Sequence, residues 1–489
     1  MKQTAGDGMP GVMRIGGAVA ATLVLLAPAI WNRFPLLQYD TGGYLARWFE
    51  GYLVPSRSTV YGLFLTALAR PDFWLAIVIQ AALTVWVLAL LLRALGFGGR
   101  PLLLFGMTAA LSVLTTLPWL ASILLTDIFA GLAVLAVHVL VFGDGALRRW
   151  ERNALIALVA FSVATHSATF AVIVALLAAA ALGFVLIRIG ALSGIVRGVA
   201  AIVRGVAAIV LGAVMLVGAN YIVAGKLAWT PGGIALSFGR MLQDGVVARY
   251  LAEHCPDPRL RLCAHRHELP TDADVFFWGE SVFDRLGRFK GLGDEMSTIV
   301  VESLRAYPMW QAELAVKATA RQLLHVGTGE GVLSTMWHTY VIIEQFTPSV
   351  AADMHAARQQ RGELDFTVIN RIHEPVALAS MLLLIPLMAW GLRREPFADL
   401  GRLATTIALA LLANAVVCGV FANPHDRYGA RLVWLAPLLA LLAVHRLFAA
   451  KATREATGEA TGEATREATR EADPGIAPAR TALGADPTA

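Results

Sequence analysis

Long apolar runs alternate with short polar joins along most of the chain. Several runs reach about 20 residues, the length that an α-helix needs to cross a bilayer. They lack the alternation of apolar and polar residues that is typical of membrane β-strands. The pattern predicts an all-α polytopic membrane protein with about ten transmembrane helices, at residues 15–31, 73–92, 101–118, 127–142, 154–166, 168–187, 205–224, 374–392, 403–421 and 431–448.

Basic residues between these runs predict the orientation of the helices. Alternate joins carry Arg93 and Arg100; Arg148, Arg149 and Arg152; Arg188, Arg197 and Arg204; Arg393, Arg394 and Arg402; and then Arg446 and Lys451. Short joins rich in arginine stay in the cytoplasm, so both termini are predicted to be cytoplasmic. The first outer loop opposes this assignment with Arg33, Arg47, Arg57 and Arg70, but the other basic segments outnumber it.

Two segments on the predicted outer side are too unusual to be simple joins. The first outer loop (32–72) contains two short helical patterns, "YLARWFEG" and "VYGLFLTALA", which are expected to lie flat on the membrane. Residues 226–372 are too many for a structureless loop and predict a small, mostly helical periplasmic subdomain. The predicted organisation is therefore an N-terminal transmembrane module (1–225), this subdomain (226–372), C-terminal transmembrane helices (373–450) and a disordered low-complexity tail (451–489).

Local signals bound the helices of these two segments. Asp40 can cap the first flat helix, which is expected to stop at Gly51. Ser56, Ser58 or Thr59 can cap the second flat helix. The first flat helix would place Leu45, Trp48, Phe49 and Tyr52 near one face and Arg47 and Glu50 on the other. In the outer subdomain, Pro308 is expected to break or kink a helix.

Composition and cysteine usage agree with a membrane protein. The chain is 57% hydrophobic and only 15% charged, and its net charge of +5 is spread over helix ends, so it does not indicate nucleic-acid binding. On an oxidising outer side, Cys255 and Cys263 are expected to form a disulfide, with two free thiols as the alternative. Cys418 lies in an apolar run and is expected to be an inert core thiol. The "HRH" sequence at 265–267 fits no common zinc spacing.

A perfect tandem repeat, "IVRGVAAIVRGVAA", occupies residues 195–208. It places Arg197 and Arg204 two turns apart on one helix face. We interpret it as a basic interfacial helix that leads into a transmembrane span, in preference to a lipid-binding device.

An ordered series of motifs resembles the GT-C superfamily of integral membrane glycosyltransferases. Asp40 follows the first span, "SRSTVYGLFL" lies on the second flat helix, and Gln80 opens the second span. Further along are "ASILLTDIFAGLAVLAV", "LVAFSVATHSATF", "ESLRAYPMWQAELAVKATARQLLHV" and "FANPHDRYGARLVWLAPLLALLAV". The series covers residues 15–448. The chain departs from the family at two points: His166 stands where arginine is common, and Thr41 follows Asp40 where many members have glutamate.

This resemblance implies transfer of a sugar from a polyprenyl-phosphate carrier to a lipid or glycan acceptor at the periplasmic face of a bacterial inner membrane. Asp40 would be the catalytic base. The expected substrate-binding residues are Arg57, Arg427 and Arg431, which would stabilise the lipid phosphate, together with Tyr61, Asp127, His166 and Tyr428. No cofactor is predicted, although the missing glutamate leaves a divalent metal open.

Two other functions remain open from the sequence. The missing glutamate is compatible with a catalytically inactive scaffold related to this superfamily. A transporter or flippase is the other alternative, although the two halves show no internal repeat and the spans contain few charges. An enzyme requires Asp40, Asp127 and Arg427 to surround one cavity, whereas a transporter predicts a polar path at mid-membrane. Asp40 and Asp127 as helix caps, and Arg427 as a membrane anchor, are the structural alternatives.

Overall fold

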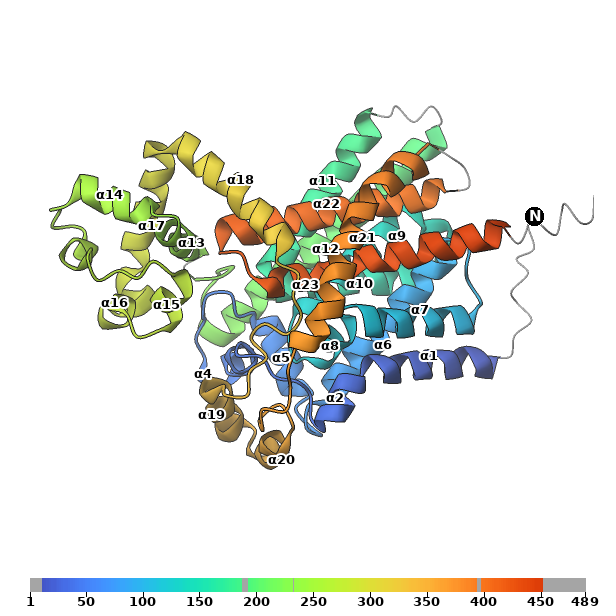
Figure 1. Cartoon of the computed structure of the whole chain (residues 1–489), viewed down its shortest axis with the longest axis horizontal. Coiled ribbons are helices and arrows are strands. Elements are labelled where there is room, and N and C mark those ends of the chain that lie inside the picture. The colour runs from blue at the N-terminus through green and yellow to red at the C-terminus, as the bar shows by residue number, and fades with distance from the viewer. Residues whose placement is uncertain (1–10, 187–191, 232, 394–396, 452–489) are drawn as a thin grey trace, which may run out of the picture. The chain divides into compact units, whose positions relative to one another are not determined.

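The computed structural model describes residues 11–186, 192–231, 233–393 and 397–451, and regular structure in this part of the chain is helical (Figure 1). One isolated β-bridge joins Leu36 to Ile123. Residues up to Leu439 form one compact unit, and the site described below lies within it. The prediction of an all-α fold is confirmed for the described residues.

Six helices in the described residues are long and apolar enough to span a membrane, which gives the chain the character of a multi-pass membrane protein. They are α6 (Trp74–Ala94), α11 (Ser167–Leu186), α12 (Leu192–Ala224), α21 (Thr367–Gly391), α22 (Ala398–Phe421) and the helix over Asp426–Lys451, which begins with α23 (Asp426–Val433). All six coincide with predicted spans.

The four other predicted spans also fall on helices, but these are shorter. They are α1 (Gly11–Leu25) with α2 (Ala27–Asn32), α7 (Pro101–Leu114), which is followed by α8 (Leu117–Ser122), α9 (Asp127–Phe142) and α10 (Arg149–Thr165). Helix α9 is almost entirely buried among its neighbours. A count of ten spans therefore stays a prediction.

The first outer loop forms α3 (Thr41–Leu45), α4 (Arg47–Glu50) and α5 (Thr59–Ala67). As predicted, the first helical stretch ends at Gly51, whose φ of 70° is the left-handed conformation that glycine adopts without strain. Ser58 is the residue that caps α5, because its hydroxyl accepts from the backbone N–H groups of Val60 and Tyr61.

One expectation for this loop was wrong. Asp40 precedes α3 but makes no capping hydrogen bond, because its carboxylate is engaged by arginine side chains. Arg47 is buried. Its guanidinium donates to the carbonyl oxygens of Gly43 and Tyr52 and to Glu50, and these bonds compensate the charge that the fold removes from water.

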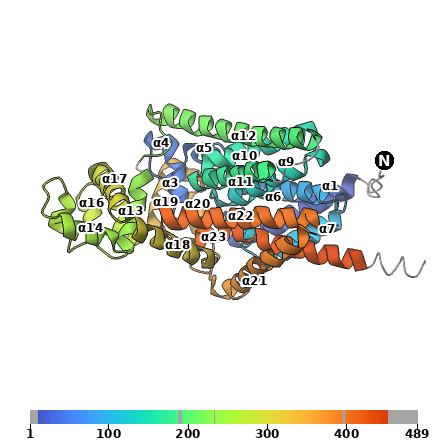
Figure 2. The same cartoon turned by 90° about the horizontal axis from the view of Figure 1, so that it is seen from above.

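Residues 226–372 form helices α13 to α20, with short 3₁₀ turns. Their bounds are Gly233–Gln243, Val246–His254, Ala273–Trp278, Val282–Arg285, Arg288–Ala306, Pro308–Leu324, Trp337–Phe346 and Ala351–Ala356. Helices α13 to α18 share a hydrophobic core of their own, built on aromatic residues such as Phe238, Phe276 and Phe283. Figure 2 shows α13, α14, α16 and α17 gathered together, beside α18. Pro308 ends one helix and opens the next, as expected.

The cysteines occupy the positions that the sequence suggested. Cys255 and Cys263 form a disulfide, with Cα atoms 5.5 Å apart, at the edge of the core shared by α13 to α18. Cys418 is a buried free thiol in α22. The predicted tail at 451–489 lies outside the described residues, apart from Lys451.

Residues near the end of the segment 226–372 hold the first outer loop in place through hydrogen bonds. Gln359 accepts from the backbone N–H of Leu37 at 3.0 Å and donates to its carbonyl oxygen at 2.7 Å. Thr339 of α19 donates to the carbonyl oxygen of Tyr39 at 3.0 Å and accepts from the backbone N–H of Gly42 at 3.3 Å. The backbone on both sides of Asp40 is therefore held by residues about 300 positions away in the sequence.

Replacing Gly429 of α23 by alanine is expected to destabilise the protein by about 1–3 kcal/mol, the usual cost of overpacking a core. A Cβ at this position would overlap the carbonyl oxygen of His325, and backbone atoms cannot move aside as a flexible side chain can. The measurement is chemical unfolding of the purified protein in detergent.

Gly106→Ala is the matched control for this substitution. Gly106 also lies inside a helix, but a Cβ there would have no neighbour within 4 Å. The control is expected to be neutral or slightly stabilising, since alanine favours helix over glycine. Equal behaviour of the two variants would contradict the close packing of α23 at His325.

Candidate functional site

Arg427 joins the two acidic residues that the sequence singled out. Its Nη1 donates to Asp40 Oδ2 at 2.5 Å, and its Nε donates to Asp127 Oδ2 at 2.8 Å. Arg57 donates from Nη2 to the other oxygen of Asp40. The structure therefore brings Asp40, Arg57, Asp127 and Arg427 into one connected group, which we call the charge cluster.

Each member of the charge cluster sits where a helix begins. Asp40 directly precedes α3, Asp127 is the first residue of α9, and Arg427 is the second residue of α23. Arg57 lies in the turn before α5. Helix starts carry free N–H groups and partial positive charge, so they favour nearby carboxylates and phosphates. The cluster is thus at one common end of several helices.

The charge cluster is withdrawn from solvent. The exposed fraction is 5% for Asp40, 1% for Asp127 and 9% for Arg427. Ion pairs at such depth depend on complete pairing, since an uncompensated buried charge is costly. One oxygen is not paired: Asp127 Oδ1 is buried and accepts no hydrogen bond from any described residue. A hydrogen-bond donor on a bound molecule would satisfy it.

A second basic group lies next to the charge cluster. Arg431 is fully buried and donates from Nε to Asn414 Oδ1 at 2.9 Å. Its Nη1 lies 3.2 Å from Nδ1 of His166, which also accepts from the backbone N–H of Ala168. Nδ1 of His166 is therefore an acceptor and its proton resides on Nε2. Among the described residues, Arg431 has no carboxylate partner within 4 Å.

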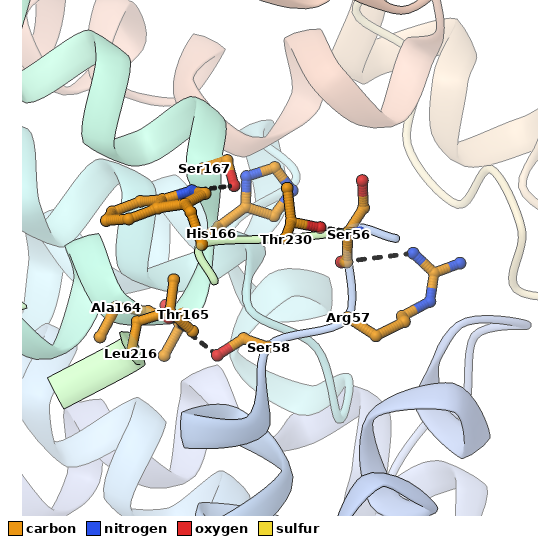
Figure 3. A pocket seen from close by; sticks show the side chains of 10 residues that line it. Ser56, Arg57, Ser58, Ala164, Thr165, His166, Ser167, Leu216 and Thr230 are labelled. Carbon is orange, nitrogen blue, oxygen red and sulfur yellow. Dashed lines mark hydrogen bonds between the residues drawn. The ribbon is translucent and has the colours of Figure 1, made fainter. Parts of the chain in front are cut away.

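A small pocket opens beside Arg57 and His166 (Figure 3). It encloses about 40 Å³ and places Ser56, Arg57 and Ser58 across from Thr165, His166 and Ser167. The wall is completed by Ala164, Leu216, Trp229 and Thr230. Hydroxyl, imidazole and guanidinium donors therefore converge on one space, an arrangement suited to an anion such as phosphate.

A second pocket of about 20 Å³ lies on the Asp127 side of the cluster. Its polar lining includes Gln38, Asp127, Glu330 and Arg427, and its apolar lining includes Trp119. The charge cluster thus separates two small spaces, one rich in basic and hydroxyl groups and one containing carboxylates.

Two further residues lie beside the charge cluster: Glu330, which lies within residues 226–372, and His425, which directly precedes α23. Glu330 accepts from the backbone N–H of Arg427 at 2.6 Å and lies 2.7 Å from Nδ1 of His425. The other ring nitrogen of His425 is 3.5 Å from Asp274 of α15. Burial by itself would lower the pKa of His425, but the two carboxylates outweigh it and raise the pKa to about 10.

This contact predicts a pH-dependent stability. The folded pKa of His425 lies above its unfolded value of about 6.5, so the stabilisation is complete below that pH and is lost as the pH rises through about 10. The difference in melting temperature between the unmutated protein and His425→Gln should therefore be largest below pH 6.5 and close to zero above pH 10. Melting curves across this range check it, and a constant difference would contradict the ion pair.

The remaining predicted site residues occupy two different positions. Tyr428 is half-buried, and the guanidinium carbon of Arg427 lies 5.9 Å from the centre of its ring. Tyr61 is fully buried and donates its hydroxyl to Gln80 at 3.1 Å. Its ring packs edge-on against Tyr44, 5.2 Å away. The contact of Tyr61 with a substrate stays a prediction.

A divalent metal does not fit the charge cluster. Arg427 occupies the carboxylate oxygens of Asp40 and Asp127 that face each other, so they do not form a shared set of free oxygen ligands. No group of three or more His, Cys, Asp or Glu side chains in the described parts of the chain is placed to hold a metal ion. In the "HRH" sequence, His265 instead pairs with Glu268 at 3.0 Å.

Sequence reasoning missed Glu330, Asn414 and Gln359 as parts of this site. Glu330 lies in the glycine-rich turn "GTGEG" (327–331), and Gly327 donates its backbone N–H to Asp426 at 3.0 Å. That cluster of glycines before a polar segment was the available signal, because it predicts a turn that allows close backbone approach. No comparable local pattern marks Asn414 or Gln359. Comparison of the chain with protein-family models, curated proteins and solved structures gave no match.

Proposed function

We propose that this protein is a membrane glycosyltransferase. It would transfer a sugar from a polyprenyl-phosphate carrier to a lipid or glycan acceptor at the periplasmic face of a bacterial inner membrane. The observation that carries the proposal is the double pairing of Asp40, whose two oxygens accept from Arg57 and Arg427. A candidate base and two candidate phosphate ligands are therefore in direct contact.

In this proposal, a phosphate and the carboxylate of Asp40 compete for the same guanidinium groups. Phosphate oxygens and carboxylate oxygens bind arginine with the same geometry and charge. When a donor phosphate binds between Arg57 and Arg427, it competes with Asp40 for both guanidinium groups. Asp40 is then relieved of hydrogen bonds and can accept a proton. Donor binding would thus activate the base.

The transfer step follows from these positions. The acceptor hydroxyl oxygen attacks the anomeric carbon of the sugar, and the bond between that carbon and the phosphate oxygen breaks. The leaving phosphate keeps the bonding electron pair, and Arg57 and Arg427 stabilise its negative charge. Asp40 takes the proton of the acceptor hydroxyl. Asp127 Oδ1, which accepts no hydrogen bond from the described residues, would accept one from an acceptor hydroxyl.

The surroundings of the charge cluster suit a lipid-borne substrate. Arg427 lies at the start of a helix that is a candidate membrane span, and Asp127 opens a shorter apolar helix. In the first outer loop, Phe49 and Tyr52 are 42% and 52% exposed, so both rings are accessible to lipid. Aromatic rings favour the headgroup level of a bilayer, where a polyprenyl phosphate presents its phosphate.

The same ion pairs also favour a second candidate, a catalytically inactive scaffold. A buried arginine between two carboxylates could have a purely structural role, which is to hold α3, α9 and α23 together. A transporter is less well supported, because the charges gather at one end of the helices and not along a path between them.

A transfer assay distinguishes these candidates. The purified full chain is reconstituted in vesicles with a labelled polyprenyl-phosphate sugar, and label is followed into membrane lipid or glycan. Incorporation of label supports the transferase. No turnover with any of a panel of donors would overturn it and favour the scaffold. Movement of the intact donor between leaflets without transfer would favour the transporter.

A further inference from the structure

A large cavity lies between helices α9, α11, α12 and α22, separate from the charge cluster. It encloses about 810 Å³, within the range typical of ligand sites. Most of its lining is apolar, contributed by residues such as Leu140, Phe142, Leu176, Ala180, Phe184 and Leu409. Helices α9 and α11 each contact the other three helices, and Figure 2 shows α11, α12 and α22 running in the same direction.

The cavity sits at the far ends of these helices. Helix α9 carries Asp127 at its start and His138 in the cavity wall, 11 positions later, which corresponds to about 16 Å along the helix. In α22, Arg402 lines the cavity and Asn414 contacts Arg431, about 18 Å further along. A bilayer core is about 30 Å thick, so the cavity and the charge cluster are separated by about half of that thickness along the helices.

The tandem repeat at 195–208 forms part of the cavity wall. Within α12, Gly198 and Arg204 line the cavity. The glycines of the repeat allow α12 to approach α11 closely: a Cβ at Gly205 would lie 2.6 Å from Leu177, and one at Gly198 would lie 2.8 Å from Phe184. The repeat therefore fixes the helix face that presents Arg204.

The polar lining of the cavity is predominantly basic. Arg204 pairs with Asp144 at 3.1 Å, and Asp144 also pairs with Arg152 at 2.5 Å. The guanidinium carbon of Arg402 lies 5.8 Å from the centre of the Phe142 ring, and no carboxylate in the described residues forms an ion pair with it. Two arginines thus share one acid, and Arg402 has no acidic partner among the described residues.

We propose that this cavity binds an anionic phospholipid of the surrounding bilayer. Its acyl chain would fill the apolar part, and its phosphate would lie against Arg402 and Arg204. Basic pockets between transmembrane helices select anionic headgroups in this way, because guanidinium groups neutralise the phosphate where water is scarce. The cavity combines an apolar volume with the guanidinium of Arg402, which forms no ion pair with a described residue. A ligand with both a hydrocarbon chain and a negative charge fits this combination. This binding does not depend on the proposed sugar transfer.

Native mass spectrometry of retained lipid tests the proposal. The full chain is reconstituted in nanodiscs of phosphatidylcholine and phosphatidylglycerol and released into mild detergent, and bound lipids are identified and counted. The unmutated protein is expected to retain phosphatidylglycerol. Arg402→Gln should lower its occupancy about fivefold, the effect of one arginine near an anionic headgroup, whereas Arg402→Lys should keep most of it.

Two further variants make the outcome decisive. Ala180→Trp fills the apolar part of the cavity and should abolish retention, while size-exclusion elution reports whether the variant is folded. Arg100→Gln removes an exposed arginine that does not line the cavity and should change nothing. Equal retention in Arg402→Gln, Arg100→Gln and the unmutated protein would overturn the proposal. Retention of phosphatidylcholine alone, or displacement of phosphatidylglycerol by an added polyprenyl phosphate, would overturn the assigned class of lipid.

Discussion

Replacing Arg427 by glutamine is expected to lower the free energy of unfolding by about 3–5 kcal/mol, the range found when one partner of a buried ion pair is removed. Arg427 holds Asp40 and Asp127 through separate nitrogens, and all three residues are buried. Without the guanidinium, Asp127 loses its only charged partner within 4 Å among the described residues. Chemical unfolding of the purified protein in detergent measures the loss.

Two other variants show whether the loss arises from unpaired charge. Arg70→Gln removes an exposed arginine of the same outer loop and should leave stability within about 0.5 kcal/mol of the unmutated value. Adding Asp127→Asn to Arg427→Gln removes the stranded carboxylate and should recover part of the lost stability. If Arg427→Gln were as stable as Arg70→Gln, the buried ion pairs would not exist.

Asp40→Asn is expected to lower sugar transfer by about 10²–10⁴-fold, the usual contribution of a positioned general base. An amide cannot accept the proton of the acceptor hydroxyl. Its oxygen can still accept a hydrogen bond from Arg57 or Arg427, so the variant should fold. The initial rate of label transfer in reconstituted vesicles is the measurement, with unfolding followed in parallel.

Asp72→Asn is the matched control for this variant. It makes the same carboxylate-to-amide change in the same outer loop, at a position whose φ of 47° asparagine tolerates well. The control should transfer at the rate of the unmutated protein. Full activity in Asp40→Asn would remove Asp40 as the base.

The sequence predicted the helices because their signals are local. Apolar runs, the glycine after α4 and the proline at the start of α18 each act on neighbouring residues, and the corresponding helix ends lie where expected. Short helices were harder to predict: the predicted span 101–118 contains all of α7 and only the first two residues of α8, because Thr115 adopts extended backbone at the end of α7. Hydrophobicity alone does not detect such a break.

The site could be predicted only in its residue types. Asp40 and Arg427 are 387 positions apart, and nothing local in the sequence indicates that they form an ion pair. The burial of Arg47 was also not predictable, because a charged side chain can be buried when backbone carbonyl groups compensate it, and those acceptors are known only from the fold. The order of the motifs suggested which residues belong to the site. The ion pairs between these residues depend on how the helices pack, which the sequence does not show.

The central claim is that Asp40 and a lipid phosphate compete for Arg57 and Arg427. Equilibrium binding of a polyprenyl monophosphate to the reconstituted protein tests this directly, with Arg57→Gln and Asp40→Asn as variants. We expect Arg57→Gln to bind more weakly. We expect Asp40→Asn to bind about tenfold more tightly than the unmutated protein, although it transfers sugar much more slowly, because the competing carboxylate charge is gone. Binding that is unchanged or weakened in Asp40→Asn would contradict the account.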